Sequence, residues 1–153
     1  MLSELAGALR AVPGLDSTFI AMNGDVLTTL DYERLVDFHR DRQAALTVST
    51  HTKHVDIDLG VIDSRDGLIT GYREKPSFDY NVSMGVYVYE PRALEHLPAT
   101  GPCQFPDLVL RLLNAGERIA AYTSDAEWYD IGTFGELERA VKDLEERPEK
   151  FTG

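Results

Sequence analysis

The sequence holds a single cysteine, comparatively few basic residues and no long hydrophobic run. Because Cys103 has no second cysteine to pair with, an internal disulfide is excluded and an oxidising compartment is not indicated. No stretch approaches the roughly 18 consecutive apolar residues of a membrane span, and the first residues lack the basic start and apolar centre of a signal peptide. These absences predict a soluble protein of the cytoplasm without a membrane partner.

Basic side chains are outnumbered by acidic ones. Lys and Arg together number 15 and Asp and Glu number 26, which gives a formal net charge of -11 at pH 7. This balance argues against nucleic acid or an anionic membrane surface as the main partner, because both would repel the protein. A small anionic ligand stays possible, since a local basic group or a metal ion can dominate the field within a cleft.

The length and composition predict one ordinary domain. Hydrophobic residues make up 43% of the 153 positions, which is enough for a packed core. No internal repeat, low-complexity tract or linker divides the chain. We expect a domain over residues 1–146 and a flexible C-terminal tail over residues 147–153.

Helix and strand patterns alternate along the first third of the chain and then give way to a hairpin. Such alternation is typical of a parallel sheet covered by helices on both faces. The hairpin turn is predicted in the segment SRDG, with Gly67 at positive φ. The predicted elements, in chain order, are a helix over residues 2–10, a strand over 18–22, a helix capped by 29–31 and ending near 42, a strand over 44–50, hairpin strands over 57–62 and 68–74, a strand over 81–90, helices over 91–97 and 105–114, strands over 117–123 and 128–131, and a helix over 134–146.

Asp25 lies where an apolar strand gives way to a turn, in the segment Asn23-Gly24-Asp25. In open α/β sheets, ligands bind at the carboxyl ends of strands. Gly24 lets the backbone turn closely there, and Asp25 offers hard oxygen ligands suited to Mg²⁺. The alternative interpretation is that the segment is only a turn.

A second carboxylate, Asp130, also ends a short apolar strand and is also followed by a glycine, Gly132. If both strands belong to one sheet and end on the same side, Asp25 and Asp130 converge on one Mg²⁺ that also binds a phosphate. The alternative is that Asp130 caps the final helix, a role that Thr133 also suits.

The segment Glu74-Lys75-Pro76 stands at the end of the second hairpin strand. Lys75 is a point charge suited to a phosphate, and Glu74 can accept hydrogen bonds from sugar hydroxyls. A solvated turn is the alternative. His51 and His54 have a spacing that a metal site would allow, but no further ligand is near in sequence, and we interpret this segment as an exposed connector.

Four motifs, in this order, resemble the sugar-1-phosphate nucleotidylyltransferases, the enzymes that make nucleoside diphosphate sugars. They are NGD at residues 23–25, EKP at 74–76, SMGVYVYEP at 83–91 and WYDIGT at 128–133. The resemblance covers about residues 5–139. It implies an α/β fold of the Rossmann-like kind, with a mixed, mostly parallel sheet, flanking helices and a β-hairpin insertion.

The resemblance also implies a chemistry. A sugar-1-phosphate oxygen would attack the α-phosphate of a nucleoside triphosphate, and pyrophosphate would leave. The catalytic residues would be Asp25, Lys75 and Asp130, with Mg²⁺ held by the two aspartates and Lys75 on the sugar phosphate. The substrate contacts implied are Gly24, Glu74, Lys75, Ser83 and Gly85. Many family members have Asn-x-Gly where this chain has Ser83-Met84-Gly85, so the resemblance does not imply which sugar is bound.

The front of the chain departs from the family pattern. Family members open with a strand and a Gly-rich loop that cradle the triphosphate, whereas the LAGALR segment of this chain resembles a later helix of that half. We therefore expect a truncated family member that is weak or inactive as this chain alone, because several charge-assisted hydrogen bonds would be missing. We also expect a second copy or a partner chain to cover the position of the missing strand.

Two other functions stay open from the sequence. One is a non-catalytic module that binds sugar phosphates or nucleotides. The other is a receiver-like signalling domain, which also places an Asp at a strand end and a Lys before a Pro. A receiver, however, requires an acidic pair on its first strand and five regular β-α units, and the hairpin interrupts that plan.

Overall fold

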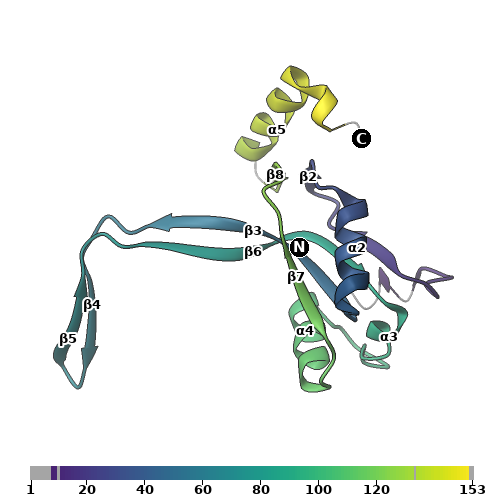
Figure 1. The fold of residues 1–153 in the computed structure, drawn as a ribbon, viewed down its shortest axis with the longest axis horizontal. Helices are drawn as coiled ribbons and strands as arrows, with labels where there is room; N and C mark the ends of the chain where they lie inside the picture. The colour runs from purple at the N-terminus through teal and green to yellow at the C-terminus, as the bar shows by residue number, and fades with distance from the viewer. Residues whose placement is uncertain (1–7, 10, 133, 152–153) are drawn as a thin grey trace.

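The computed structural model describes residues 8–9, 11–132 and 134–151, and its centre is a four-stranded sheet in the order β1-β6-β3-β7 (Figure 1). β6 pairs antiparallel with both β1 and β3, and β3 pairs parallel with β7. β1, β3 and β7 therefore run in one direction and β6 runs against them. The strands of this sheet are β1 (Phe19–Met22), β3 (Leu46–Asp56), β6 (Ser77–Tyr89) and β7 (Ile119–Thr123).

Two smaller sheets and several helices complete the described fold. β2 pairs antiparallel with β8, and β4 pairs antiparallel with β5. These elements are β2 (Val26–Thr28), β4 (Val61–Arg65), β5 (Leu68–Arg73), β8 (Trp128–Asp130), α2 (Tyr32–Arg42), α3 (Pro91–Leu94), α4 (Phe105–Asn114), α5 (Phe134–Glu146) and the 3-10 helix η1 (Pro148–Lys150). The predicted α/β class with a mixed sheet and flanking helices is confirmed, although the only parallel pairing among the described strands is β3 with β7.

The two faces of the central sheet are covered by different helices. Side chains alternate between faces along a strand, so neighbouring residues of β6 enter different clusters. Tyr87 and Tyr89 pack with Leu108 and Leu112 of α4. Val86 and Val88 pack instead with Leu35 of α2 and with Leu30, which precedes that helix. Each fully buried leucine of this kind contributes about 1.5–3 kcal/mol to folding, so the two clusters hold the helices on opposite faces.

The outer halves of β3 and β6 leave the core as a two-stranded ribbon, and the β4–β5 hairpin extends from its end (Figure 1). The strand predicted over residues 44–50 was too short, because the polar residues after Thr50 continue β3 through pairing with β6 rather than through burial. The strand predicted over residues 57–62 was also placed too early, since β4 begins at Val61. The predicted turn is confirmed, with Asp66 at φ 51 and Gly67 at φ 80.

The helices follow their local signals. Asp31 caps α2 by accepting a hydrogen bond from the Arg34 backbone N–H at 3.0 Å, as predicted. The bounds of α4 and α5 match those predicted, whereas α3 ends at Leu94, short of the predicted residue 97. The helix predicted over residues 2–10 falls mostly outside the described residues.

The segment predicted as a tail makes specific contacts. Arg147 and Lys150 both donate to Glu127 Oε1, at 2.7 and 2.6 Å. Phe151 lies against Tyr129 of β8, with 6.3 Å between ring centroids. Among the described residues, no helix is long and apolar enough to cross a membrane.

Candidate functional site

Asp25 and Asp130 lie side by side at one end of the small β2–β8 sheet. Asp130 pairs directly with Val26, and the backbone N–H of Ile131 donates to the Asp25 carbonyl at 2.8 Å. The two aspartates are far apart in the sequence, yet this ladder fixes their backbones as neighbours. Asp130 is not the N-terminal cap of α5, which begins at Phe134, and its Oδ1 accepts a long hydrogen bond of 3.4 Å from the Gly132 N–H.

Both carboxylates line an open cleft of about 710 Å³. The cleft is bounded by the β2–β8 sheet, by the start of the β3–β6 ribbon and by the first turns of α5. The residues that line it are Asp25, His51, Thr52, Lys53, His54, Val82, Trp128, Asp130, Gly132, Glu136 and Arg139. A pocket of this size can hold a small ligand such as a nucleotide or a sugar phosphate.

The structure brings three of the four sequence motifs together at this cleft. The Asn23 N–H donates to the Gly85 carbonyl at 2.8 Å, and Trp128 Nε1 donates to the Met84 carbonyl at 2.8 Å. Gly85 has φ 76, and a Cβ there would lie 2.8 Å from Asn23 Nδ2. Only glycine fits this contact without strain, which explains why the NGD and SMG segments pack so closely.

Ser83 lies on the same segment of β6 as Gly85. Its hydroxyl accepts the Gly85 N–H at 3.2 Å and donates to the Tyr87 hydroxyl at 3.3 Å. The pairing of β6 with β3 shifts register here, between Val48 and Thr50. Ser83 therefore stabilises an irregular stretch of strand beside the cleft. Gly24 differs from Gly85, because no described atom lies within 4 Å of where its Cβ would be.

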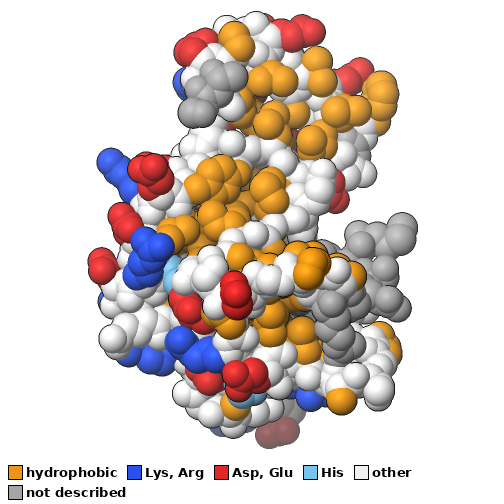
Figure 2. Space-filling model, turned by 90° about the vertical axis from the view of Figure 1, so that its right-hand side faces the viewer, with side chains coloured by type: hydrophobic (Ala, Val, Ile, Leu, Met, Phe, Trp, Pro, Cys, Tyr) orange, Lys and Arg blue, Asp and Glu red, His pale blue; other side chains and the backbone are white. Residues whose placement is uncertain are grey.

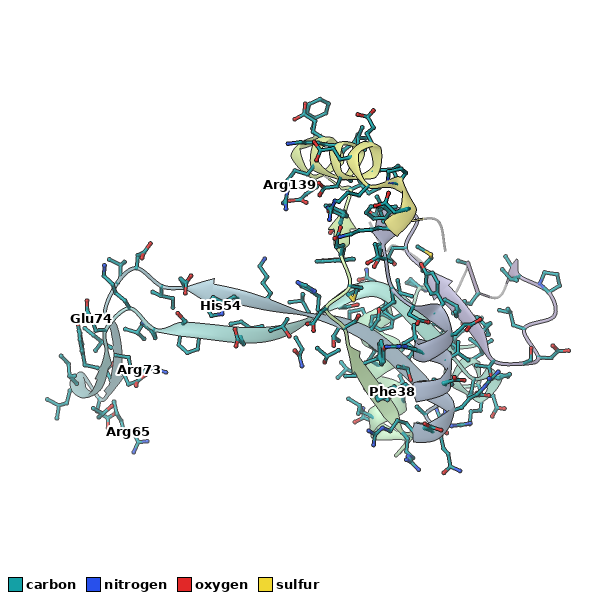
Figure 3. The ribbon with its side chains drawn as sticks, turned by 45° about the horizontal axis from the view of Figure 1, so that its top comes forward. Phe38, His54, Arg65, Arg73, Glu74 and Arg139 are labelled. Carbon is teal, nitrogen blue, oxygen red and sulfur yellow. The ribbon has the colours of Figure 1, made fainter. Side chains whose placement is uncertain are left out.

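Glu74 and Lys75 lie elsewhere. They precede β6 at the outer end of the ribbon, where Figure 3 shows Glu74 near Arg73 and far from Arg139 of α5. Glu74 accepts a hydrogen bond from the Tyr72 hydroxyl, and Lys75 has φ 42. At about 3.4 Å per strand residue, the six steps from Ser77 to Ser83 span roughly 20 Å. The structure does not bring these two residues to the carboxylate pair.

The sequence analysis missed the contribution of residues 51–54, which it interpreted as a connector. His51 and Lys53 line the cleft, and the His51 ring lies 6.0 Å from the Trp128 ring. His54 contacts Asp79 at 2.5 Å and Asp56 at 3.2 Å, and the hydrogen bond to Asp79 raises the pKa of His54 above 6.5. A usable signal was present, because these residues directly follow a buried strand, as Asp25 does.

Some charged side chains around the cleft form ion pairs, and others have no ion-pair partner among the described residues. Arg139 donates to Glu136 at 3.0 Å. Within the described part of the chain, Asp25, Asp130 and Lys53 have no ion-pair partner at 4.0 Å or less. Both carboxylates are exposed to the same cleft without a cationic partner among the described residues, so a cation bound there would add an attraction to each.

The two carboxylates fit a Mg²⁺ site of the kind completed by a substrate. Mg²⁺ is usually bound by one or two carboxylates together with phosphate oxygens and water. In the described residues, no group of three or more His, Cys, Asp or Glu side chains could enclose a metal without such help. The pair Asp25 and Asp130 therefore has the right chemistry for Mg²⁺ if a phosphate supplies further ligands.

Comparison with known proteins gives a consistent family. Residues 5–147 match the family described as Nucleotidyl transferase. The UTP–glucose-1-phosphate uridylyltransferase of Synechocystis is 30% identical over 97% of this chain and 45% of its own length. The glucose-1-phosphate adenylyltransferase of Clostridium perfringens strain SM101 is 25% identical over 82% of this chain and 35% of its own length. The chain thus spans less than half the length of these two relatives.

Solved structures agree with the fold. The crystal structure of HddC from Yersinia pseudotuberculosis superposes with a TM-score of 0.59, covers 91% of this chain and 60% of its own, and is 21% identical in sequence. At that identity the likeness concerns the arrangement of helices and strands.

Proposed function

The chain belongs to the nucleotidyl transferase family, and from this membership we propose that it carries the metal and phosphate cleft of a sugar-1-phosphate nucleotidyltransferase. In the proposed reaction, an oxygen of the sugar-1-phosphate bonds to the α-phosphorus of a nucleoside triphosphate. The bond from that phosphorus to the β-phosphate breaks, and pyrophosphate leaves with its electron pair. The relatives' names support this class, since they join different nucleotides to the same substrate, glucose-1-phosphate.

The observation that carries the proposal is the adjacency of Asp25 and Asp130 at the edge of an open cleft. In this proposal both carboxylates hold Mg²⁺, which when bound neutralises charge on the phosphates during transfer. The remaining work is positioning, because phosphoryl-type transfers need orientation more than a covalent nucleophile. Gly85 serves that end by keeping the Asn23-Gly24-Asp25 turn against β6.

The other predicted contacts belong to the same proposal. Gly24 and Ser83 are next in sequence to Asp25 and Val82, which line the cleft, and in the proposal they approach the substrate from there. Glu74 and Lys75 would have to act from the end of the ribbon, about 20 Å along β6 from Ser83. Small-molecule substrates rather than nucleic acid or a membrane surface suit the acidic net charge of -11, and a cytoplasmic location suits the single cysteine.

An association with a second copy or a partner chain is also part of the proposal. β1 is an edge strand of the described sheet, and its Ile20 and Met22 are 38% and 46% exposed. Figure 2 shows hydrophobic side chains gathered across one face of the molecule. An open edge with apolar side chains is a surface that another strand can pair with. Light scattering after gel filtration tests this, with a mass above 17.1 kDa expected for an oligomer.

The function itself is tested by incubating the protein with Mg²⁺, glucose-1-phosphate and each nucleoside triphosphate in turn. Release of pyrophosphate that needs both substrates supports nucleotidyl transfer. A thermal shift with glucose-1-phosphate or a triphosphate, without turnover, would instead indicate a binding module. If the protein shows no turnover and also binds none of these ligands, the proposal is refuted.

A further inference from the structure

We infer that Lys53 is the cation that binds a substrate phosphate beside Asp25 and Asp130. This inference rests on the proposed function and adds to it a binding residue that neither the motifs nor the resemblance indicate. The ligand chemistry is a phosphate group next to a carboxylate-bound metal. Two sources are possible, the phosphate of a sugar-1-phosphate and the phosphates of a nucleoside triphosphate.

Lys53 has the right position. It lies on β3 opposite Tyr80 of β6, midway along the ribbon between Thr50 and Asp56, and it lines the same cleft as the two aspartates. Its side chain is exposed to that open space rather than packed in the core. A lysine of this kind carries a mobile point charge with three donors, which suits a phosphate whose final position is set by other groups.

Among the described lysine and arginine side chains that line the cleft, Lys53 is the one with no ion-pair partner at 4.0 Å or less. Arg139 pairs with Glu136 at 3.0 Å, and His54 is held by Asp56 and Asp79 along the ribbon. By contrast, no described residue forms an ion pair with Lys53. A divalent ion on Asp25 and Asp130 would cancel their two charges. The positive charge of Lys53 would then be left to attract an anion, despite the acidic character of the whole protein.

Lys75 lacks these properties in the structure. It does not line the cleft, and it lies at the outer end of the ribbon, next to the hairpin that Figure 3 shows around Glu74 and Arg73. A lysine side chain reaches only about 6 Å from its Cα, far less than the roughly 20 Å of strand between Ser77 and Ser83. For Lys75 to contact the same phosphate, the ribbon would have to bend over the cleft.

The experiment is calorimetric titration of the full chain, in Mg²⁺, with glucose-1-phosphate and separately with UTP. The variants are Lys53→Met, Lys53→Arg, Lys75→Met and, as a matched control, Lys142→Met. Lys142 lies on the exposed side of α5, where it is 3.9 Å from Glu146. Lys53→Met is expected to lower the affinity for one of the two ligands about 10- to 100-fold, which corresponds to the loss of one charge-assisted hydrogen bond. The ligand whose affinity falls identifies the source of the phosphate that Lys53 binds.

Two further readouts separate binding from a structural role. Lys53→Arg keeps the charge and is expected to retain most of the affinity. For wild type, affinity falls as salt is raised, and this dependence is expected to be weaker in Lys53→Met, because one screened ion contact is gone. Lys142→Met should match wild type in both respects. Thermal unfolding of Lys53→Met should also match wild type, since the side chain is exposed.

The outcomes are distinct. If Lys53→Met binds both ligands with the same affinity as wild type, the inference is wrong and the proposed function stands. The inference is equally wrong if Lys75→Met loses affinity while Lys53→Met does not, because the ribbon must then close over the cleft. If wild type binds neither ligand, the proposed function fails and the inference fails with it.

Discussion

Asp25 and Asp130 are neighbours across the β2–β8 ladder, where the Ile131 N–H donates to the Asp25 carbonyl at 2.8 Å. The far end of the same ladder is tied by Thr29, whose N–H donates to the Glu127 carbonyl at 3.0 Å and whose hydroxyl accepts the Glu127 N–H at 3.0 Å. With hydrogen bonds at both ends, the small sheet holds the backbones of Asp25 and Asp130 in a fixed relationship. This preorganisation is what a metal and phosphate site requires.

Replacing either aspartate by asparagine tests the site by activity. Asp25→Asn and Asp130→Asn are each expected to lower Mg²⁺-dependent pyrophosphate release by about 100-fold or more, because a bound metal supplies several kcal/mol of charge stabilisation. Both side chains are exposed, so the melting temperature should change little. Asp66→Asn is the control, since Asp66 lies in the hairpin turn at φ 51, a conformation that asparagine tolerates. Equal turnover in all three variants would exclude the aspartates from catalysis.

Gly85 is expected to be needed for stability as well as for the shape of the cleft. Gly85→Ala combines a left-handed backbone with a Cβ placed 2.8 Å from Asn23 Nδ2 and 3.1 Å from Val26 Cγ2. Gly116→Ala is the matched control, because Gly116 has φ 75 and no described atom within 4 Å of its Cβ position. The control should lose about 1–2 kcal/mol in the free energy of unfolding, and Gly85→Ala about 1–3 kcal/mol more. Equal losses in urea denaturation would show that the close contact costs nothing.

His39 is expected to make the fold sensitive to acid. Its ring is buried, with Nε2–H donating to Glu90 at 3.1 Å and Nδ1 accepting from Thr47 at 2.8 Å. Burial lowers the pKa of His39 below 6.5, although Glu90 opposes the shift. The unfolded chain therefore binds the proton more readily, so the stabilising contribution is complete above pH 6.5 and is lost as pH falls through the lowered pKa. In His39→Gln, the fall in urea midpoint between about pH 7 and pH 5 should be smaller than in wild type.

His54 serves as the control, because its pKa is shifted in the direction opposite to that of His39. Its pKa is raised above 6.5 by the hydrogen bond to Asp79 and by the charge of Asp56. Its contribution is complete below pH 6.5 and is lost as pH rises through the raised pKa. His54→Gln should therefore lose stability mainly at acid pH. If His39→Gln and His54→Gln alter the pH profile in the same direction, the account of the buried His39 is wrong.

The β4–β5 hairpin is expected to contribute little to the stability of the core. It lies beyond the ribbon and away from the helices in Figure 1, and Leu68, Ile69 and Tyr72 are 73%, 69% and 61% exposed. Replacing residues 57–76 by Asn-Gly would join Asp56 to Ser77, which already pair, through a two-residue turn. The free energy of unfolding should then stay within about 1 kcal/mol of wild type. A larger loss in urea denaturation would mean that the hairpin packs against the core in solution.

Local signals in the sequence predicted much of the fold. α4 and α5 begin and end as expected, because apolar spacing, Pro106 and Gly116 act within a few residues. The outer half of β3 was missed for a physical reason. Apart from Val55, the residues from His51 to Asp56 are polar and mostly exposed, and they form a strand because β6 pairs with them. Backbone pairing leaves no periodic hydrophobic pattern where neither face of the strand is buried.

The candidate site was predicted in part. The rule that ligands bind at strand ends pointed to Asp25 and Asp130, and the ladder confirms that they are neighbours. The same rule, applied to the strand predicted over residues 44–50, also pointed to the segment that holds Lys53, but that segment was interpreted as an exposed connector. The sequence did not indicate the direction of the ribbon, which sets the distance between Lys75 and the aspartates. The roles of these residues in binding and catalysis stay predictions.

The most direct test of the account is the binding of Mn²⁺, used as a spectroscopic substitute for Mg²⁺, measured by electron paramagnetic resonance with glucose-1-phosphate present. Asp25→Asn and Asp130→Asn should each weaken Mn²⁺ binding at least about 10-fold, and the double variant should be scarcely worse than either one, because two ligands of one ion act as a unit. Mn²⁺ affinity that is unchanged in both single variants would contradict the shared metal site.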